Sequence, residues 1–328
     1  MGVRAAGPLD LPGVSSYVDR VIRDPAAIIG CVLPGPLAGR AFAGWPRLVP
    51  ALFGLRSRMR VWIETTGGRV RSAALVYEGH RPEWVVLLLV GDPTPEGADA
   101  AFRLLSSLCA AAARSGMHRV FGSVPDEARP RETFFQAGFY SYTRETWFVS
   151  AGPSLPRPSA ELAARTARSV DAHDLFRFYV ATTPHAVQRA EQLSVHDFDV
   201  DRSAGAFDPP HLIGGNPLGM RRSTVLLDRA DDRPRGLAVG FRGLERHPHV
   251  LKVRSAEGDV DRARDLLRAA ARGLPADRPL VAPVRSYEEH VARALLSEGA
   301  KESATAMLFV KELAVRIEEP ALAPVVVR

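Results

Sequence analysis

The sequence predicts an α/β protein, of the α+β kind, built from two copies of one fold, each a mixed and mostly antiparallel sheet flanked by helices. Three observations lead to this prediction. The order of strand-like and helix-like segments in the first half recurs in the second half. One offset of 161 residues superimposes characteristic residues of the two halves. The chain has 328 residues and is 46% hydrophobic, which is enough for two ordinary cores.

The repeat rests on residues that recur at this single offset. The pairs are Arg4 and Arg165, Asp10 and Asp171, Gly97 and Gly258, Leu105 and Leu266, Glu127 and Glu288, Gly138 and Gly299, and Phe148 and Phe309. Because the offset holds from start to finish without a gap, we expect two domains of similar length. We place the first domain at 1–150, a proline-rich linker at 151–163, the second domain at 164–318 and a tail at 319–328.

The first half opens with a short strand and a helix, and then a hairpin at 60–79 that turns at a Thr-Gly-Gly sequence. The apolar run at 84–91 is typical of a central strand covered on both faces. A helix follows, with Thr94 as N-cap, Pro95 as its first residue and Gly116 as its stop.

A strand, a second helix that ends at Gly138, and a final strand complete the first half. The second half repeats this order, with a hairpin at 223–241, a central strand at 249–255 and a helix at 259–274. The following strand lies at 278–284, and a last helix and strand occupy 287–313. Residues 201–219 have loop composition and occur only in this copy.

The charge and the cysteines exclude several classes of protein. The net charge is +6, but the basic residues are scattered, so we expect no nucleic-acid partner. Cys31 and Cys109 form no metal spacing and no disulfide framework. His247 and His249 have no third ligand nearby, so we expect no metal. The cysteine pattern therefore favours a reducing, cytoplasmic compartment. We find neither a signal peptide nor an apolar stretch that could span a membrane.

This doubled order resembles the GCN5-related N-acetyltransferase (GNAT) family, arranged as a tandem. The stretch "VRAAGPLDLPGV" is similar to the first strand and loop of that family, and "RTARSVDAHDL" resembles the same feature in the second half. The stretch "FFQAGFYSYTRETWFV" resembles the last helix of the family, which ends in a Gly-Phe pair and runs into the final strands. The resemblance covers nearly the whole chain.

The resemblance implies that acetyl-CoA binds as co-substrate, and we place it in the first half. The strand end at Leu89, Val90 and Gly91 would polarise the thioester through its backbone N–H groups. The helix start at Glu96, Gly97 and Ala98 would face the diphosphate, since a helix N-terminus attracts anions. Phe134 and Phe135 would line the acyl or pantetheine pocket, although buried aromatic residues more often form ordinary core. Gly97 is also compatible with an ordinary first-turn residue.

Two departures from the family pattern bear on activity. Thr94 and Asp99 replace the basic or amide residue and the last small residue of the phosphate turn, and Gly258 of the second copy is followed by Asp259. Phe134 and Leu295 occupy the position where the family often has a tyrosine that acts as general acid.

No catalytic residue is identified by these patterns. The candidates are Glu64 or Glu78 as base, and Tyr140, with Tyr142, beyond the glycine. We expect an acyl-CoA-dependent N-acyltransferase that acetylates a small-molecule or peptide amine. The alternative is a non-catalytic tandem pseudo-acetyltransferase that binds a ligand or a partner. The repeat further predicts that the two halves form an internal pseudo-dimer.

Overall fold

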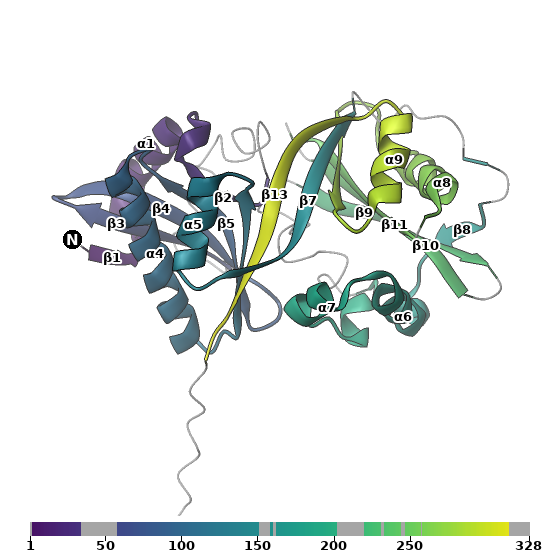
Figure 1. Cartoon of the computed structure of the whole chain (residues 1–328), viewed down its shortest axis with the longest axis horizontal. Coiled ribbons are helices and arrows are strands. Elements are labelled where there is room, and N and C mark those ends of the chain that lie inside the picture. The colour runs from purple at the N-terminus through teal and green to yellow at the C-terminus, as the bar shows by residue number, and fades with distance from the viewer. Residues whose placement is uncertain are drawn as a thin grey trace, which may run out of the picture.

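The computed structural model describes residues 2–33, 58–150, 158–159, 162–201, 220–230, 233–243, 247–256 and 258–314 (Figure 1). The first half contains β1 (Gly2–Ala5), η1 (Pro8–Asp10), α1 (Leu11–Val21), η2 (Pro25–Ala27), β2 (Ile28–Cys31), β3 (Met59–Thr66), β4 (Arg69–Glu78), β5 (Glu83–Gly91), α4 (Pro95–Arg114), β6 (Arg119–Pro125), α5 (Ala128–Gln136) and β7 (Tyr140–Ser150). The second half contains β8 (Ala164–Thr166), η4 (Ser169–Asp171), α6 (Ala172–Thr182), α7 (His185–Glu191), η5 (Val195–Phe198), β9 (Met220–Ala230), β10 (Arg233–Gly243), β11 (His249–Ser255), α8 (Val260–Ala271), β12 (Leu280–Arg285), α9 (Glu289–Ser297) and β13 (Lys301–Glu312).

The local signals that the sequence gives in the first half are confirmed. The hairpin β3–β4 turns at Gly67 and Gly68, whose φ values of 59° and 75° suit a two-residue loop. Every residue of β5 is buried, as expected of a strand covered on both faces. Thr94 caps α4 by accepting a hydrogen bond from the N–H of Gly97 at 3.1 Å. Gly116, with a φ of 75°, follows the end of α4.

The described strands form one continuous mixed sheet that runs through both halves. Its order is β1-β3-β4-β5-β6-β13-β7-β12-β11-β10-β9-β8, and β2 also pairs with β5. Most neighbours are antiparallel, whereas β5 and β6, and likewise β11 and β12, are parallel. The predicted α/β class and the mostly antiparallel sheets are therefore confirmed.

The two halves exchange their last strands, which the sequence did not predict. Strand β13 of the second half pairs with β6 of the first half, where Phe309 lies opposite Gly122. Strand β7 of the first half pairs with β12 of the second half, where Phe148 lies opposite Ala282. β7 and β13 also pair with each other, and Figure 1 shows them crossing the centre of the molecule together. Each half is thus completed by a strand from the other.

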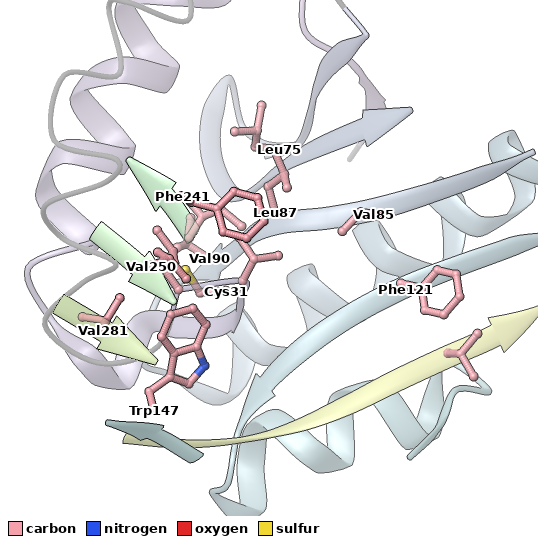
Figure 2. Packing of buried hydrophobic residues seen from close by; sticks show 14 of the residues in the cluster. Cys31, Leu75, Val85, Leu87, Val90, Phe121, Trp147, Phe241, Val250 and Val281 are labelled. Atoms are coloured by element: carbon pink, nitrogen blue, oxygen red, sulfur yellow. The ribbon is translucent and has the colours of Figure 1, made fainter. Parts of the chain in front are cut away.

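Helices cover both faces of the sheet. α4 and α5 pack on one face of the first half, and α8 and α9 pack in the same way on the second half. A third cluster spans both halves on the opposite face and includes residues of α1 and α6 (Figure 2). Trp147 of β7 lies in this cluster with Val90 of the first half and Val281 of the second. The two halves therefore share a core as well as a sheet.

The arginine and the aspartate that recur near the start of each half form an ion pair in both copies, which was not predicted. Arg4 donates two hydrogen bonds to Asp10 at 2.5 and 2.6 Å, and Arg165 donates two to Asp171 at 2.8 and 2.6 Å. In both copies the bidentate pair ties the first strand to the turn before the first helix. The second pair is less exposed, and Arg229 also approaches Asp171 at 3.6 Å.

The gapless offset, in contrast, is wrong in the middle of the repeat. Helix α4 has 20 residues and α8 has 12, so the copies differ by two turns there. The N-cap of α8 is Asp259, which accepts from the N–H of Arg262 at 3.0 Å. By helix position, Gly97 therefore corresponds to Arg262 and not to Gly258. The offset of 161 holds again from α5 and α9 onward.

Strand exchange predicts a crossed response to two equivalent mutations. Phe309 is fully buried in the core of the first half, and Phe148 is buried in the core of the second half. Each Phe→Ala change should cost about 3–5 kcal/mol of unfolding free energy. Hydrogen exchange should rise in α5 and β6 for Phe309→Ala, and in α8 and α9 for Phe148→Ala. If hydrogen exchange instead rose in the half of the sequence that contains the mutated residue, the strand exchange would be contradicted.

The two arginine–aspartate pairs predict unequal stability effects. Asp171→Asn should cost about 1.5–3 kcal/mol, because the side chain of Asp171 is only 5% exposed and accepts charge-assisted hydrogen bonds. Asp10→Asn should cost less than about 1 kcal/mol, because the side chain of Asp10 is 19% exposed and that of Arg4 is 53% exposed. The hydrogen bonds from Arg165 lower the pKa of Asp171 below its ordinary value of 3.8. The stabilisation is therefore present above that value and is lost as the pH falls through the lowered pKa.

Urea unfolding of wild type and both variants between pH 3 and 7 measures this effect. The difference between wild type and Asp171→Asn should be constant above about pH 5 and shrink below the ordinary pKa of aspartate. Equal costs for the two variants at pH 7 would contradict the assignment.

Candidate functional site

The groove in which we expected the co-substrate in the first half is filled by strand β2. The parallel strands β5 and β6 pair only as far as Val86 and Gly122, after which they diverge. Strand β2 pairs with the rest of β5, with Gly30 opposite Leu89 and Ile28 opposite Val90. This strand was not predicted.

This pairing determines what surrounds Leu89, Val90 and Gly91. β5 lies between β2 and β4 over this stretch, and the N–H of Val32 donates to the carbonyl of Leu87 at 3.1 Å. All of β5 is buried. The backbone groups that we expected to polarise a thioester thus lie inside a continuous sheet.

Phe134 and Phe135, the expected pocket walls, have different surroundings. Phe134 is fully buried beneath β2, and a Cβ at Gly30 or Gly122 would lie 3.1 or 2.5 Å from its ring. The two glycines therefore allow β2, β6 and Phe134 to pack closely. Phe135 is half-exposed and packs edge-to-face on Phe309, 5.1 Å away.

The turn at the start of α4 is tightly packed on itself. The N–H of Gly97 donates to the side chain of Thr94, and the N–H of Ala98 donates to its carbonyl at 3.0 Å. A Cβ at Gly97 would lie 2.1 Å from the carbonyl of Asp92, which accounts for the glycine. Glu96 is exposed on the first turn.

The candidate catalytic residues of the first half are not brought together. Glu64 is fully buried and accepts from Arg103 of α4 at 2.9 Å. Tyr140 is partly exposed and donates to Glu312 of β13 at 3.0 Å. Glu78 pairs with Arg60 at 3.2 Å. Cys31 and Cys109 are buried, which raises the pKa of each thiol to about 12.

The corresponding strands of the second half diverge and leave a hollow between them. β11 and β12 pair only at His249 with Leu280 and at Val250 with Val281. Among the described residues, no strand pairs with the rest of β11 on that side. The hollow has an empty volume of about 710 Å³, including the solvent at its mouth. Its apolar lining consists of Leu193, Phe198, Leu237, Val239, Val253 and Pro283.

The open edge of β11 presents backbone donors to this hollow. The N–H of His249 donates to Pro279, on the side of β12, at 2.9 Å. Since backbone groups alternate sides along a strand, the N–H groups of Leu251 and Val253 point to the same side. The equivalent groups of β5 face β2.

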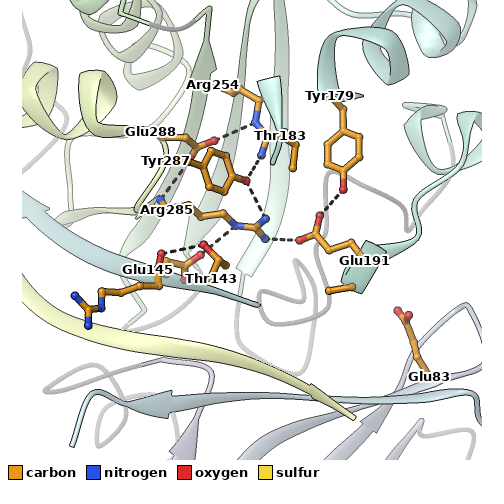
Figure 3. Close-up of polar contacts among 12 residues, drawn as sticks. Glu83, Thr143, Glu145, Tyr179, Thr183, Glu191, Arg254, Arg285, Tyr287 and Glu288 are labelled. Carbon is orange, nitrogen blue, oxygen red and sulfur yellow. Dashed lines mark hydrogen bonds and ion pairs between the residues drawn. The ribbon is translucent and has the colours of Figure 1, made fainter. Parts of the chain in front are cut away.

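A buried network of charged side chains forms the polar lining of the hollow (Figure 3). Arg285 lies 2.6 Å from Glu191, which also accepts from the hydroxyl of Tyr179 at 2.9 Å. Arg254 lies 3.0 Å from Glu288 and donates to Thr183 at 2.7 Å. Buried carboxylates and guanidinium groups are costly unless they are paired in this way.

Tyr287 joins the two arginines of the network. Its hydroxyl oxygen accepts from Arg254 and from Arg285, each at 3.1 Å. A phenol oxygen has two lone pairs and one hydrogen, so this hydroxyl can still act as a donor. Burial raises the pKa of Tyr287, although the two arginines oppose the shift, and the phenol is protonated at neutral pH.

The first half supplies part of this site through the exchanged strand. Glu145 of β7 lines the hollow, and its carboxylate lies 3.9 Å from Arg285. Burial alone would lower the pKa of Arg285, but Glu191 and the other groups around it raise the pKa well above its ordinary value. Arg285 therefore carries its charge at the centre of the network.

Sequence reasoning missed most of this network. Glu288, which recurs with Glu127 at the repeat offset, is the N-cap residue of α9. Arg285 and Tyr287 follow the predicted strand directly, and charged residues at the end of a buried strand are a signal that could have been used. Glu191 and Glu145 lie far from Arg285 in the sequence, and Glu145 reaches the hollow only through the strand exchange, which was not predicted.

Other features of the described chain bear on ligands. No group of three His, Cys, Asp or Glu side chains in the described ranges could hold a metal ion. His249 is buried, accepts from the N–H of Gly243 and contacts Asp277 at 3.1 Å. Within the same ranges, none of the helices combines the length and the apolarity needed to cross a bilayer.

Comparison with known proteins identifies the fold. No protein-family model matches the sequence, and no curated protein matches it. Many solved structures match, and two that match over nearly their whole length share 13% identity with this chain. A GCN5-related N-acetyltransferase from Sphaerobacter thermophilus has a TM-score of 0.53, with 97% of both chains covered. A tandem GNAT protein from the clavulanic acid biosynthesis pathway has a TM-score of 0.54, with 96% of this chain and 99% of that chain covered. The chain has the fold of the tandem GCN5-related N-acetyltransferases.

Proposed function

We propose that the protein is an acyl-CoA-dependent N-acyltransferase and that its reaction takes place in the hollow of the second half. The observation that carries the proposal is the divergence of β11 and β12, which leaves an open strand edge beside buried charged groups. The first half is the less suitable site, because β2 occupies the same space there. The GNAT fold supports acyl transfer as the reaction class, by analogy of fold.

The residues around the hollow fit an acyl-CoA arm. The N–H groups of Leu251 and Val253 would hold it along the open edge of β11 and polarise its carbonyl. Acyl-CoA would supply an activated thioester, which needs little beyond positioning for attack by an amine. The start of α8 is less favourable for a diphosphate, because Asp259 and Asp261 lie there.

The acceptor amine would bind to the carboxylates of the hollow. Glu145, Glu191 and Glu288 all line it and are each more than nine-tenths buried. Buried carboxylates favour an ammonium ion over water and can accept its proton. The apolar lining would contact the rest of a small acceptor. We infer that Glu191 holds the amine and that Tyr287 delivers a proton to the departing group.

A second candidate function is binding without turnover. It is favoured by the network itself, in which the arginines and carboxylates of the hollow are already paired with one another. Such a protein would bind acyl-CoA or an amine and release it unchanged. Measuring binding and turnover on the same sample separates the two functions.

Matched charge reversals test which half binds acetyl-CoA. Glu96 and Asp261 occupy the same position in the first turns of α4 and α8, and both are exposed or nearly so. If the diphosphate lies at α8, Asp261→Lys should tighten acetyl-CoA binding by about 3–10-fold at low salt, while Glu96→Lys should leave it unchanged. Isothermal titration calorimetry at two salt concentrations measures this.

The opposite pattern would return the site to the first half, as the sequence suggested. Absence of binding to folded wild-type protein at millimolar acetyl-CoA and CoA would refute the transferase proposal.

Tyr287→Phe should lower kcat for acyl transfer by about 100-fold, because it removes the proton donor. The matched control is Tyr140→Phe, which removes a partly exposed hydroxyl from β7 and should leave kcat unchanged. Thiol release from acetyl-CoA can be measured with a panel of primary amines, with the affinity for acetyl-CoA measured alongside. A loss confined to Tyr140→Phe would move the chemistry to the first half.

A further inference from the structure

The C-terminal end of α7 is held by two arginines of the first half. Arg81 donates to the carbonyls of Glu191 and Gln192 at 2.8 and 3.2 Å. Arg119 donates to the carbonyl of Ala190 at 3.1 Å. The last carbonyls of a helix have no partner within the helix, so these bonds satisfy groups that would otherwise be left over.

Helix α7 needs such support because it is short and ends in a strained residue. It has seven residues, too few to be stable by its own hydrogen bonds. Gln192 follows it with a φ of 46°, and it is the only residue other than glycine with a positive φ in the described ranges. A left-handed conformation costs about 1–2 kcal/mol for such a residue, so the chain turns there only if its contacts hold it.

The two arginines are fixed by a buried carboxylate of their own half. Glu83 lies 2.9 Å from Arg81 and 4.0 Å from Arg119. Glu83 begins β5, Arg119 begins β6, and the two are opposite each other in the parallel pair. Glu83 and Arg119 are 5% and 6% exposed. Arg81 and Arg119, both ion-paired with Glu83 at the start of β5, therefore hold the C-terminal end of α7 by hydrogen bonds.

Glu191, whose backbone carbonyl accepts the hydrogen bond from Arg81, is also a residue of the hollow lining. Glu191 contacts Arg285 at 2.6 Å and Tyr179 at 2.9 Å through its side chain, and Arg81 through its carbonyl. In Figure 3, Glu83 lies on the first-half side of Glu191, and the network lies on the other side.

We propose that Arg81 and Arg119 are positioning residues that set the place of Glu191 in the site of the second half. The first half would thereby act on a reaction that it does not perform. Together with Glu145 on β7, it would complete a site that the second half cannot form alone. This inference rests on the proposed function for its catalytic meaning, but the placement of Glu191 can be tested without turnover.

The first test follows the hydroxyl of Tyr179, which donates to Glu191. In protein labelled with ¹³C at the tyrosine Cζ, Tyr179→Phe assigns the signal. Glu191→Gln should shift it, and Arg119→Met and Arg81→Met should shift it in the same direction. Arg119→Lys should restore part of the wild-type position. Arg60→Met, which removes an exposed arginine of the same half, is the matched control and should leave the signal unchanged.

The second test is a double-mutant cycle on turnover with the best amine of the panel. Arg119→Met should raise KM for the amine by about 10-fold, as expected for a misplaced binding group, with little change in the Kd of acetyl-CoA. The effect should vanish in the Glu191→Gln background, because the arginine acts through that residue. Additive effects would overturn the proposal.

The two tests separate this inference from the proposed function. If wild type shows no turnover but Arg119→Met still shifts the Tyr179 signal, the positioning role stands and the transferase proposal falls. If Glu191→Gln shifts the signal and the arginine variants do not, the positioning role is refuted whatever the activity.

Discussion

The exchange of β7 and β13 is the constraint on which the rest of the structure depends. A strand at the edge of a sheet exposes unpaired backbone groups, and both β6 and β12 would be such edges without a partner from the other half. Because each half receives its last strand from the other, neither sheet is complete alone. The shared sheet then brings Trp147 into a core common to both halves and carries Glu145 to the second-half hollow.

The segment that follows the first helix of each repeat differs between the two halves, and this difference decides whether the space between the parallel strands is filled. After α1, the chain enters its own groove as β2, with Gly30 allowing close contact with Phe134. After α6, the equivalent stretch is the end of α7, which stays outside the groove and contributes Glu191. In the first half this space is filled by β2, whereas in the second half the described residues leave an open hollow with a charged lining. Divergence between duplicated halves is therefore visible as a choice between strand and helix at one position.

The sequence predicted what depends on neighbouring residues. The hairpin at Gly67, the cap at Thr94 and the stop at Gly116 all arise from local chemistry, and all are confirmed. The prediction was incomplete where segments far apart in the sequence could occupy the same position in the sheet. Nothing in "AAIIGC" says that it will pair with β5, and either Phe148 or Phe309 could have packed beside β6. The residues of the hollow come from seven separate elements, so no local pattern connects them.

Strand exchange also has a consequence for the order in which the protein is made. β13, the partner of β6, begins about 175 residues after β6 ends. At a rate of synthesis of about 5–20 residues per second this interval is roughly 10–35 s. During this interval β7 has already been synthesised and could pair with the edge of β6. A first half that is closed by its own strand β7 is therefore the structure that competes with the native one. To form the native sheet, β7 must either not pair with β6 or dissociate from it before β13 is synthesised.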